Sequence, residues 1–160
     1  MKKNKPYNPF LIAGYYSPDY FCDREQETLK IISALENDRN ISLMSPRRFG
    51  KTGLIHHVFY RISEKNENAV CIYFDIFSGS RQHLMSEIFL SAKRPFYQST
   101  QIMSLDTINK DNYFQFANAH FQKSNHTITE ECFNLIYLQF EGHTWYVQAL
   151  LKQGIEEIDR

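Results

Sequence analysis

Gly50, Lys51 and Thr52 are the residues whose types and spacing best match a chemical task. They close the eight-residue segment Ser45-Pro46-Arg47-Arg48-Phe49-Gly50-Lys51-Thr52, and Gly53 follows it. Glycine lets the main chain approach a ligand closely, lysine supplies an ammonium group for phosphate oxygens, and the threonine hydroxyl can ligate Mg²⁺. The sequence therefore predicts a loop that binds the phosphates of ATP or a related nucleoside triphosphate, with Mg²⁺ at Thr52.

The segments on either side of this loop have the order that phosphate binding requires. Ile41 to Met44 is a short apolar run that predicts a strand, and residues 50–65 have the apolar spacing of an amphipathic helix. Inward-pointing N–H groups in the loop and roughly half a positive charge at the helix N-terminus would both favour phosphate. The pattern departs from the usual glycine-rich loop at its first position, which is Ser45.

Two further cations, Arg47 and Arg48, lie inside the loop. One of them would contact phosphate or a neighbouring carboxylate, or both would be solvated or paired with acidic surface residues. The sequence leaves these alternatives open.

Composition places the chain among globular proteins and gives no sign of a polyanionic partner. The 160 residues include 18 basic and 18 acidic side chains, so no global field favours nucleic acid or an anionic membrane. Cys22, Cys71 and Cys132 have neither a disulfide nor a zinc spacing, which favours reduced thiols. Proline interrupts the start too early for a signal peptide, and no apolar run has the length of a membrane span. We therefore expect a soluble, cytoplasmic protein.

The remaining periodicity divides the chain at about residue 80. An extended arm over residues 1–20 should lead into a helix that Asp23 caps, with Gln26 completing a capping box. The other expected elements are a buried strand over residues 70–77, a helix over 81–93, a break at Arg94-Pro95, and helices over 110–123, from Thr129, and from Thr144 into the tail. We predict an α/β core over residues 1–80 and a helical region over residues 81–160.

Three segments resemble motifs of the archaeal-type ATPases, in the STAND branch of the AAA+-like P-loop NTPases. Residues 45–55 resemble their Walker A segment, residues 20–27 (Tyr-Phe-Cys-Asp-Arg-Glu-Gln-Glu) resemble the box that precedes it, and residues 142–148 (Gly-His-Thr-Trp-Tyr-Val-Gln) are similar to the Gly-His-Pro-like motif of the lid. Thr144 stands where proline is usual. The resemblance implies a P-loop NTPase-like fold with a truncated parallel sheet, flanking helices and a small all-helical lid. It also implies that Arg24 and His143 lie near the nucleotide, with Arg24 either contacting it or bracing the loop. The residues by themselves leave open that Arg24 forms a surface ion pair and that His143 is structural.

One part of the family pattern is missing from this sequence. Family members carry a Walker B strand whose acidic residues hold Mg²⁺ and polarise water. In this sequence the segment between Thr52 and Gly79 is long enough for only one helix and one strand. Either the sequence contains strands that its hydrophobic pattern does not identify, or the core is internally shortened near Ile76-Phe77. Asp75 would then ligate Mg²⁺ or cap its strand locally, and Arg94 is a candidate for reaching the γ-phosphate.

The motifs thus favour ATP binding, name no catalytic residue and leave hydrolysis open. Two other functions remain as alternatives. A non-catalytic interaction module would use exposed strand edges to bind a protein partner or a second copy of the chain. A compact P-loop kinase would use Asp75 as its acid and turn over a small acceptor.

Overall fold

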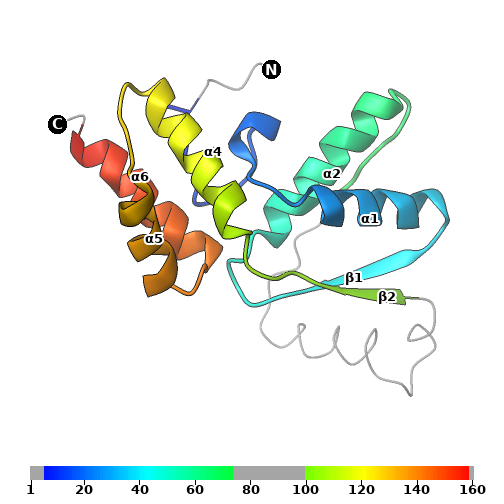
Figure 1. Cartoon of the computed structure of the whole chain (residues 1–160). Coiled ribbons are helices and arrows are strands. Elements are labelled where there is room, and N and C mark those ends of the chain that lie inside the picture. Colours follow the sequence, from blue (N-terminus) through cyan, green and yellow to red (C-terminus); the bar gives the residue numbers. More distant parts are fainter. Residues whose placement is uncertain (1–5, 74–99, 159–160) are drawn as a thin grey trace.

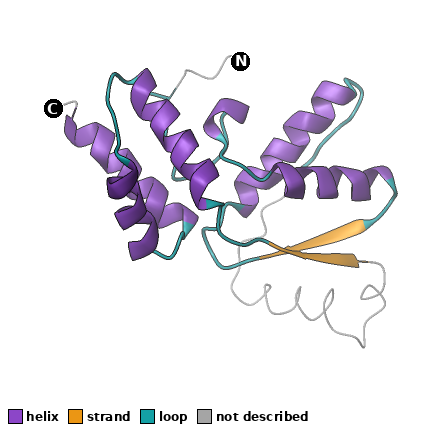
Figure 2. Cartoon of the chain, in the orientation of Figure 1, coloured by secondary structure: helices purple, strands orange, loops and turns teal. Residues whose placement is uncertain are grey.

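The computed structural model describes residues 6–73 and 100–158 (Figure 1). These ranges hold an α/β fold with a two-stranded parallel sheet, five α-helices and one short 3₁₀ helix. Figure 2 shows how the helices, strands and loops are arranged. In chain order the elements are η1 (Pro18–Tyr20), α1 (Glu25–Glu36), β1 (Asn40–Met44), α2 (Lys51–Lys65), β2 (Thr100–Ser104), α4 (Lys110–Lys123), α5 (Glu130–Gln139) and α6 (Thr144–Ile158). None of the described helices is long and apolar enough to cross a lipid bilayer.

The sheet is formed by two strands that are far apart in the sequence. Asn40 of β1 lies opposite Thr100 of β2, and the parallel register continues to Met44 opposite Ser104. Just beyond the strands, the amide of Leu105 donates to the carbonyl of Met44 at 2.9 Å. Both carboxyl ends therefore lie side by side, at the point where the β1–α2 loop begins.

Helices α1 and α2 cover one face of this sheet (Figure 1). Their buried side chains form one apolar cluster with residues of the sheet and with the residue that follows β2. Its members are Ile31, Ile32, Leu54, Val58 and Leu105, with Ile41, Leu43, Ile62, Met103 and Phe21 packed against them. This packing fixes the start of α2 above the ends of the strands.

A second apolar cluster holds α4, α5 and α6 together. It contains Phe10, Cys22, Ile108, Tyr113, Ala117, Phe121, Phe133, Val147, Leu151 and Ile155. Phe10 comes from the N-terminal arm, is 1% exposed, and lies in this cluster. The Asn8 side-chain amide donates to the carbonyl of Lys152 at 2.9 Å, so the arm is anchored to α6.

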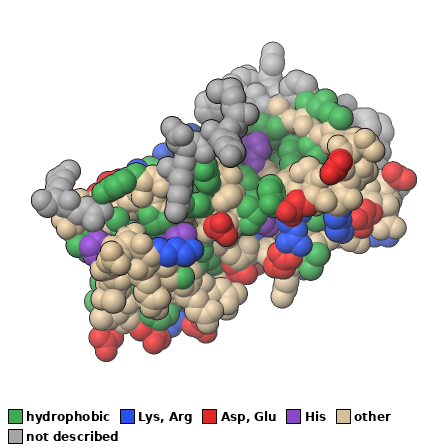
Figure 3. All heavy atoms as spheres, turned by 90° about the horizontal axis from the view of Figure 1, so that it is seen from above, with side chains coloured by type: hydrophobic (Ala, Val, Ile, Leu, Met, Phe, Trp, Pro, Cys, Tyr) green, Lys and Arg blue, Asp and Glu red, His purple; other side chains and the backbone are tan. Residues whose placement is uncertain are grey.

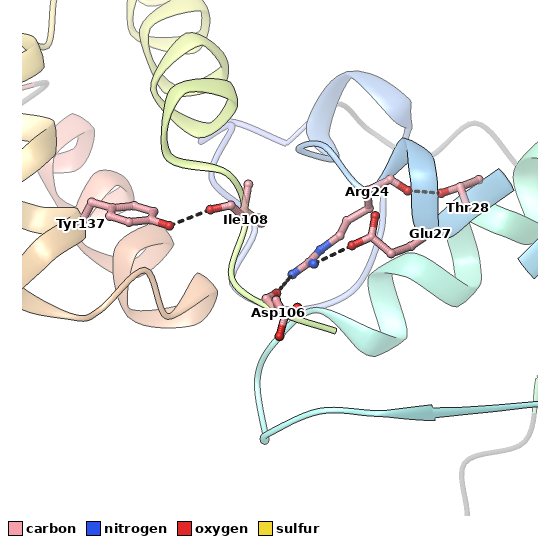
Figure 4. A network of polar contacts seen from close by, with 6 residues as sticks. All are labelled: Arg24, Glu27, Thr28, Asp106, Ile108 and Tyr137. Atoms are coloured by element: carbon pink, nitrogen blue, oxygen red, sulfur yellow. Dashed lines mark hydrogen bonds and ion pairs between the residues drawn. The ribbon is translucent and has the colours of Figure 1, made fainter. Parts of the chain in front are cut away.

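The connector between β2 and α4, residues 105–109, is held from both sides (Figure 4). From the start of α1, Arg24 Nη2 donates to the carbonyl of Asp106, while its Nη1 donates to Glu27 at 2.9 Å. From α5, the Tyr137 hydroxyl donates to the carbonyl of Ile108 at 2.7 Å. One short segment thus receives hydrogen bonds from both the sheet half of the molecule (α1, β1, α2 and β2) and its helical half (α4, α5 and α6).

Several sequence predictions are confirmed. The strand before the loop and the helix after it are β1 and α2, and the helices over 110–123, from Thr129 and from Thr144 are α4, α5 and α6. Thr129 caps α5 as expected, because its side-chain oxygen accepts from the amide of Cys132 at 3.2 Å. Asn109 caps α4, accepting from the amides of Asp111 and Asn112.

Three predictions are wrong. The capping box at Asp23 and Gln26 does not form: Asp23 and Arg24 both have left-handed φ, Arg24 is the N-cap of α1, and no side chain caps the helix. Residues 70–73 are not a strand, and Val70 is 84% exposed. Residues 81–160 are not all helical, because 100–104 form β2, whose short sequence acquires its structure only from pairing with β1.

Several expected features lie outside the described residues. These are the second half of the strand expected over 70–77, with Asp75 and the junction at Ile76-Phe77, the helix over 81–93, and the break at Arg94-Pro95.

Charges on the described surface agree with the balanced composition. On the face seen in Figure 3, acidic and basic side chains are interspersed and neither sign dominates the described part.

Candidate functional site

The β1–α2 loop is a tight connection whose last residue has a left-handed backbone. β1 ends at Met44 and α2 begins at Lys51, with Gly50 as its N-cap at φ +87°. Side chains disfavour this conformation, so glycine is the residue that fits. A Cβ at Gly50 would meet no described atom within 4 Å beyond its chain neighbours, so open space lies beside the loop at the helix N-terminus.

Lys51 folds back over the loop that precedes it. Its ammonium donates to the carbonyl of Ser45 at 2.8 Å, to the Ser45 hydroxyl at 3.0 Å and to the carbonyl of Pro46 at 2.8 Å. Burial lowers the pKa of Lys51, because desolvation disfavours the charged amine. Among the described residues, the ammonium is therefore hydrogen-bonded only to neutral oxygens of the loop, which is a suitable environment for an anion.

The start of α6 lies against the same loop. The Phe49 ring meets the His143 ring edge to face, with 4.7 Å between centroids. Arg48 precedes Phe49 by one residue and Trp145 follows His143 by two, and the Arg48 guanidinium carbon lies 4.1 Å from the centroid of the Trp145 ring. The structure thus brings together Arg48, Phe49 and His143, which the sequence analysis had assigned to one site from two distant segments.

Gly142 sets the direction in which α6 begins. Its φ is +70°, and its amide donates to the carbonyl of Tyr137 at 2.8 Å. A Cβ at Gly142 would lie 2.6 Å from the Tyr137 ring, so only glycine fits this close approach. The turn leaves His143 Nδ1 and Thr144 Oγ1 buried, with no hydrogen-bond partner among the described residues.

Arg24 has a different position from the loop residues. Arg24 is 5% exposed, and its guanidinium donates hydrogen bonds to Glu27 and to the carbonyl of Asp106. Its side-chain hydrogen bonds within the described chain are therefore with α1 and the connector, not with residues 45–53. This arrangement braces the segment that follows β2.

An aromatic layer that the sequence analysis did not identify backs the first turns of α2. The rings of Phe21 and His57 are stacked, with centroids 4.5 Å apart, and the Tyr15 hydroxyl lies 3.0 Å from His57 Nδ1. An added Cβ at Gly53 would come within 3.3 Å of the Phe21 ring, so glycine lets the arm lie against α2. Burial lowers the pKa of His57, with Arg61 adding to the effect.

Trp145 is the contact residue that the motif resemblance alone did not single out. It is the only tryptophan of the chain and follows His143 by two positions. This spacing was the one sign in the sequence that Trp145 could lie near the loop. Its contact with Arg48 depends on how the helical half packs on the sheet half. Sequence spacing could not reveal that packing.

The metal-binding capacity of the described residues is limited. No group of three or more His, Cys, Asp or Glu side chains converges within 6–73 and 100–158. Thr52 is exposed in the first turn of α2 and offers one hydroxyl. Mg²⁺ is commonly held by few protein groups together with nucleotide phosphates and water. The exposed hydroxyl of Thr52 therefore fits a magnesium ion that arrives with a nucleotide.

Comparison with protein-family models, curated proteins and solved structures finds no match to the chain. The resemblance to the archaeal-type ATPases therefore rests on the motif residues themselves.

Proposed function

We propose that the chain binds ATP or a related nucleoside triphosphate, with the phosphates in the loop from Ser45 to Gly53. The observation that carries this proposal is the position of the Lys51 ammonium, which lies within 3.0 Å of three oxygens of its own loop. This charge is located directly after a parallel strand and at the N-terminus of a 15-residue helix. A helix N-terminus, a cation and a loop of main-chain amides together favour phosphate.

The backbone of the loop supports the proposal at the position where the sequence pattern departs from the usual one. Left-handed φ values in the loop occur at Arg48 and Gly50, and Ser45 does not have one. Glycine is therefore not required at Ser45 by its main-chain conformation. The serine hydroxyl instead accepts a hydrogen bond from Lys51.

Binding would exchange the hydrogen bonds of the loop for bonds to the ligand. The three donors of Lys51, now directed to Ser45 and Pro46, would turn to phosphate oxygens, and the negative ligand would raise the lowered pKa of this lysine. Thr52 would hold the Mg²⁺ that accompanies the nucleotide, and the metal would screen the charge of the phosphates. His143 and Arg48 would line the side of the site that faces α6.

Thermal unfolding with and without saturating Mg-ATP tests the proposal. At 100 times its Kd, a ligand adds about 2.7 kcal/mol to stability, which for a chain of this size raises Tm by roughly 5–10 °C. Lys51→Ala should lose that rise. Lys65→Ala, at the other end of α2, should keep it, because Lys65 pairs with Glu36 at the surface.

A protein-binding role has one observation in its favour. Large apolar side chains are exposed on two separate segments, with Val70 and Ile72 at 84% and 65%, and Leu135 and Leu138 on α5 at 72% and 69%. Light scattering after size-exclusion chromatography tests self-association. A dimer that forms without any response of Tm to Mg-ATP would replace nucleotide binding as the leading function.

A further inference from the structure

Within the part of the chain that the structure describes, the guanidinium of Arg48 contacts an aromatic ring and pairs with no carboxylate. It lies 4.1 Å from the centroid of the Trp145 ring, and among the described residues no acidic side chain pairs with it. A cation over an aromatic face is held by the ring quadrupole without using its N–H groups. The hydrogen-bond donors of Arg48 therefore remain available to an anion.

This availability distinguishes Arg48 from Lys51. The donors of Lys51 are directed to oxygens of the loop, so a ligand must replace existing hydrogen bonds there. The planar guanidinium of arginine matches a phosphate group with two parallel N–H donors, which an ammonium group cannot do. Arg48 can thus donate to a phosphate group without first breaking a hydrogen bond of the described chain.

The backbone around Arg48 also has a fixed and unusual form. Its φ is +68°, a left-handed value that costs energy for a residue with a side chain. Such conformations persist where the surroundings hold them. Phe49, the next residue, contacts His143, so two consecutive loop residues are held by the residue before α6 and by the second residue of α6.

We propose that Trp145 is a positioning residue of the nucleotide site, which holds Arg48 in the orientation that binds a phosphate group of the ligand. The N-terminal end of α6 then forms part of the phosphate site, although it belongs to the helical half of the molecule. This inference rests on the proposed function, because it requires phosphate in the loop.

Isothermal titration of the full chain with Mg-ATP and with inorganic tripolyphosphate tests the proposal. Tripolyphosphate has the phosphate chain without a base, so the same effect on both ligands locates it at the phosphates. Trp145→Leu should raise both Kd values about fivefold, the strength of a partly exposed cation–π contact. Trp145→Phe should lie between Trp145→Leu and the wild type, because phenylalanine keeps a weaker aromatic face.

A double-mutant cycle with Arg48→Leu separates positioning from a general effect on folding. If Trp145 acts through Arg48, Trp145→Leu changes neither Kd once Arg48 is leucine. Equal effects in both backgrounds, or an unchanged Kd in Trp145→Leu, would overturn the proposal. If the Trp145→Leu chain does not fold, the same cycle is run with Trp145→Phe.

The same titrations separate this inference from the proposed function. A wild-type chain that binds neither ligand, or a Lys51→Ala chain that binds both as the wild type does, would refute the phosphate site itself. Binding that needs Lys51 and Arg48 but is indifferent to residue 145 would refute only the role of Trp145.

Discussion

The ammonium of Lys51 lies 2.8 Å from the carbonyl oxygen of Ser45 and 3.0 Å from its hydroxyl oxygen. The residue that begins α2 is therefore bonded to the residue that follows β1. Together with the bond to the carbonyl of Pro46, this contact closes the loop around its own cation. A bound anion would replace oxygens of the protein and would not have to neutralise an isolated charge.

The first prediction concerns the side chain of Ser45. Ser45→Gly should change the Kd for Mg-ATP by less than about threefold, because two main-chain carbonyls still accept from Lys51 and the hydroxyl adds one modest bond. Ser45→Asp should raise Kd by more than about tenfold, since a carboxylate would pair with Lys51 and repel phosphate. Titration calorimetry measures both, and equal losses in the two variants would contradict the prediction.

The second prediction concerns the acid stability of the fold. His57 is 5% exposed, and burial lowers its pKa. The unfolded chain therefore binds a proton on this group more readily than the folded chain, so stability falls as pH drops through the ordinary histidine value of about 6.5. The contribution is complete above that value.

Urea unfolding at pH 7.5 and pH 5.5 measures this effect. His57→Gln keeps a side chain that can accept from or donate to the Tyr15 hydroxyl, and it should lose less stability on acidification than the wild type. The neighbouring His56→Gln is the matched control and should show the acid sensitivity of the wild type. The same loss in all three chains would mean that a group other than His57 determines the effect.

The third prediction concerns the buried guanidinium of Arg24. Arg24→Met leaves Glu27 and the carbonyl of Asp106 without their donor, and should lower the free energy of unfolding by about 2–4 kcal/mol. Arg61→Met removes an exposed pair with Glu25 and should cost under about 0.5 kcal/mol. Denaturant unfolding measures the loss of stability in both variants. A similar small loss in both would show that the hydrogen bond from Arg24 to the connector contributes little to stability.

The fourth prediction concerns the turn before α6. Gly142→Ala combines a left-handed backbone with a Cβ only 2.6 Å from the Tyr137 ring, so it should cost about 2–4 kcal/mol. Gly14→Ala has a similar φ of +78° but no described atom within 4 Å of the new Cβ beyond its chain neighbours, and should cost about 1 kcal/mol. Thermal melts compare the two, and equal costs would mean that the Tyr137 ring moves away freely.

The sequence by itself determined the local elements that carry the loop. Ile41 to Met44 followed by Gly50, Lys51 and the apolar spacing of residues 51–65 predict β1, the loop and α2, because turn chemistry and helical periodicity act over a few residues. The helices after residue 109 could equally be predicted, because their apolar residues recur with helical spacing and Thr129 was recognised as the cap of α5. The positive φ at Asp23 and Arg24 could not be predicted from the sequence, because neither aspartate nor arginine requires a left-handed backbone.

Tertiary structure decided which distant residues meet. Residues 100–104 are too short and too mixed to identify as a strand, and they form β2 only because the edge of β1 supplies the hydrogen bonds. Arg48 meets Trp145, and Arg24 meets the carbonyl of Asp106, across about a hundred and about eighty residues of chain, through contacts that no spacing rule encodes. The loop chemistry is local and was visible in the sequence. The contacts of the loop with His143 and Trp145 join residues that are far apart in the sequence, and only the tertiary structure brings them together.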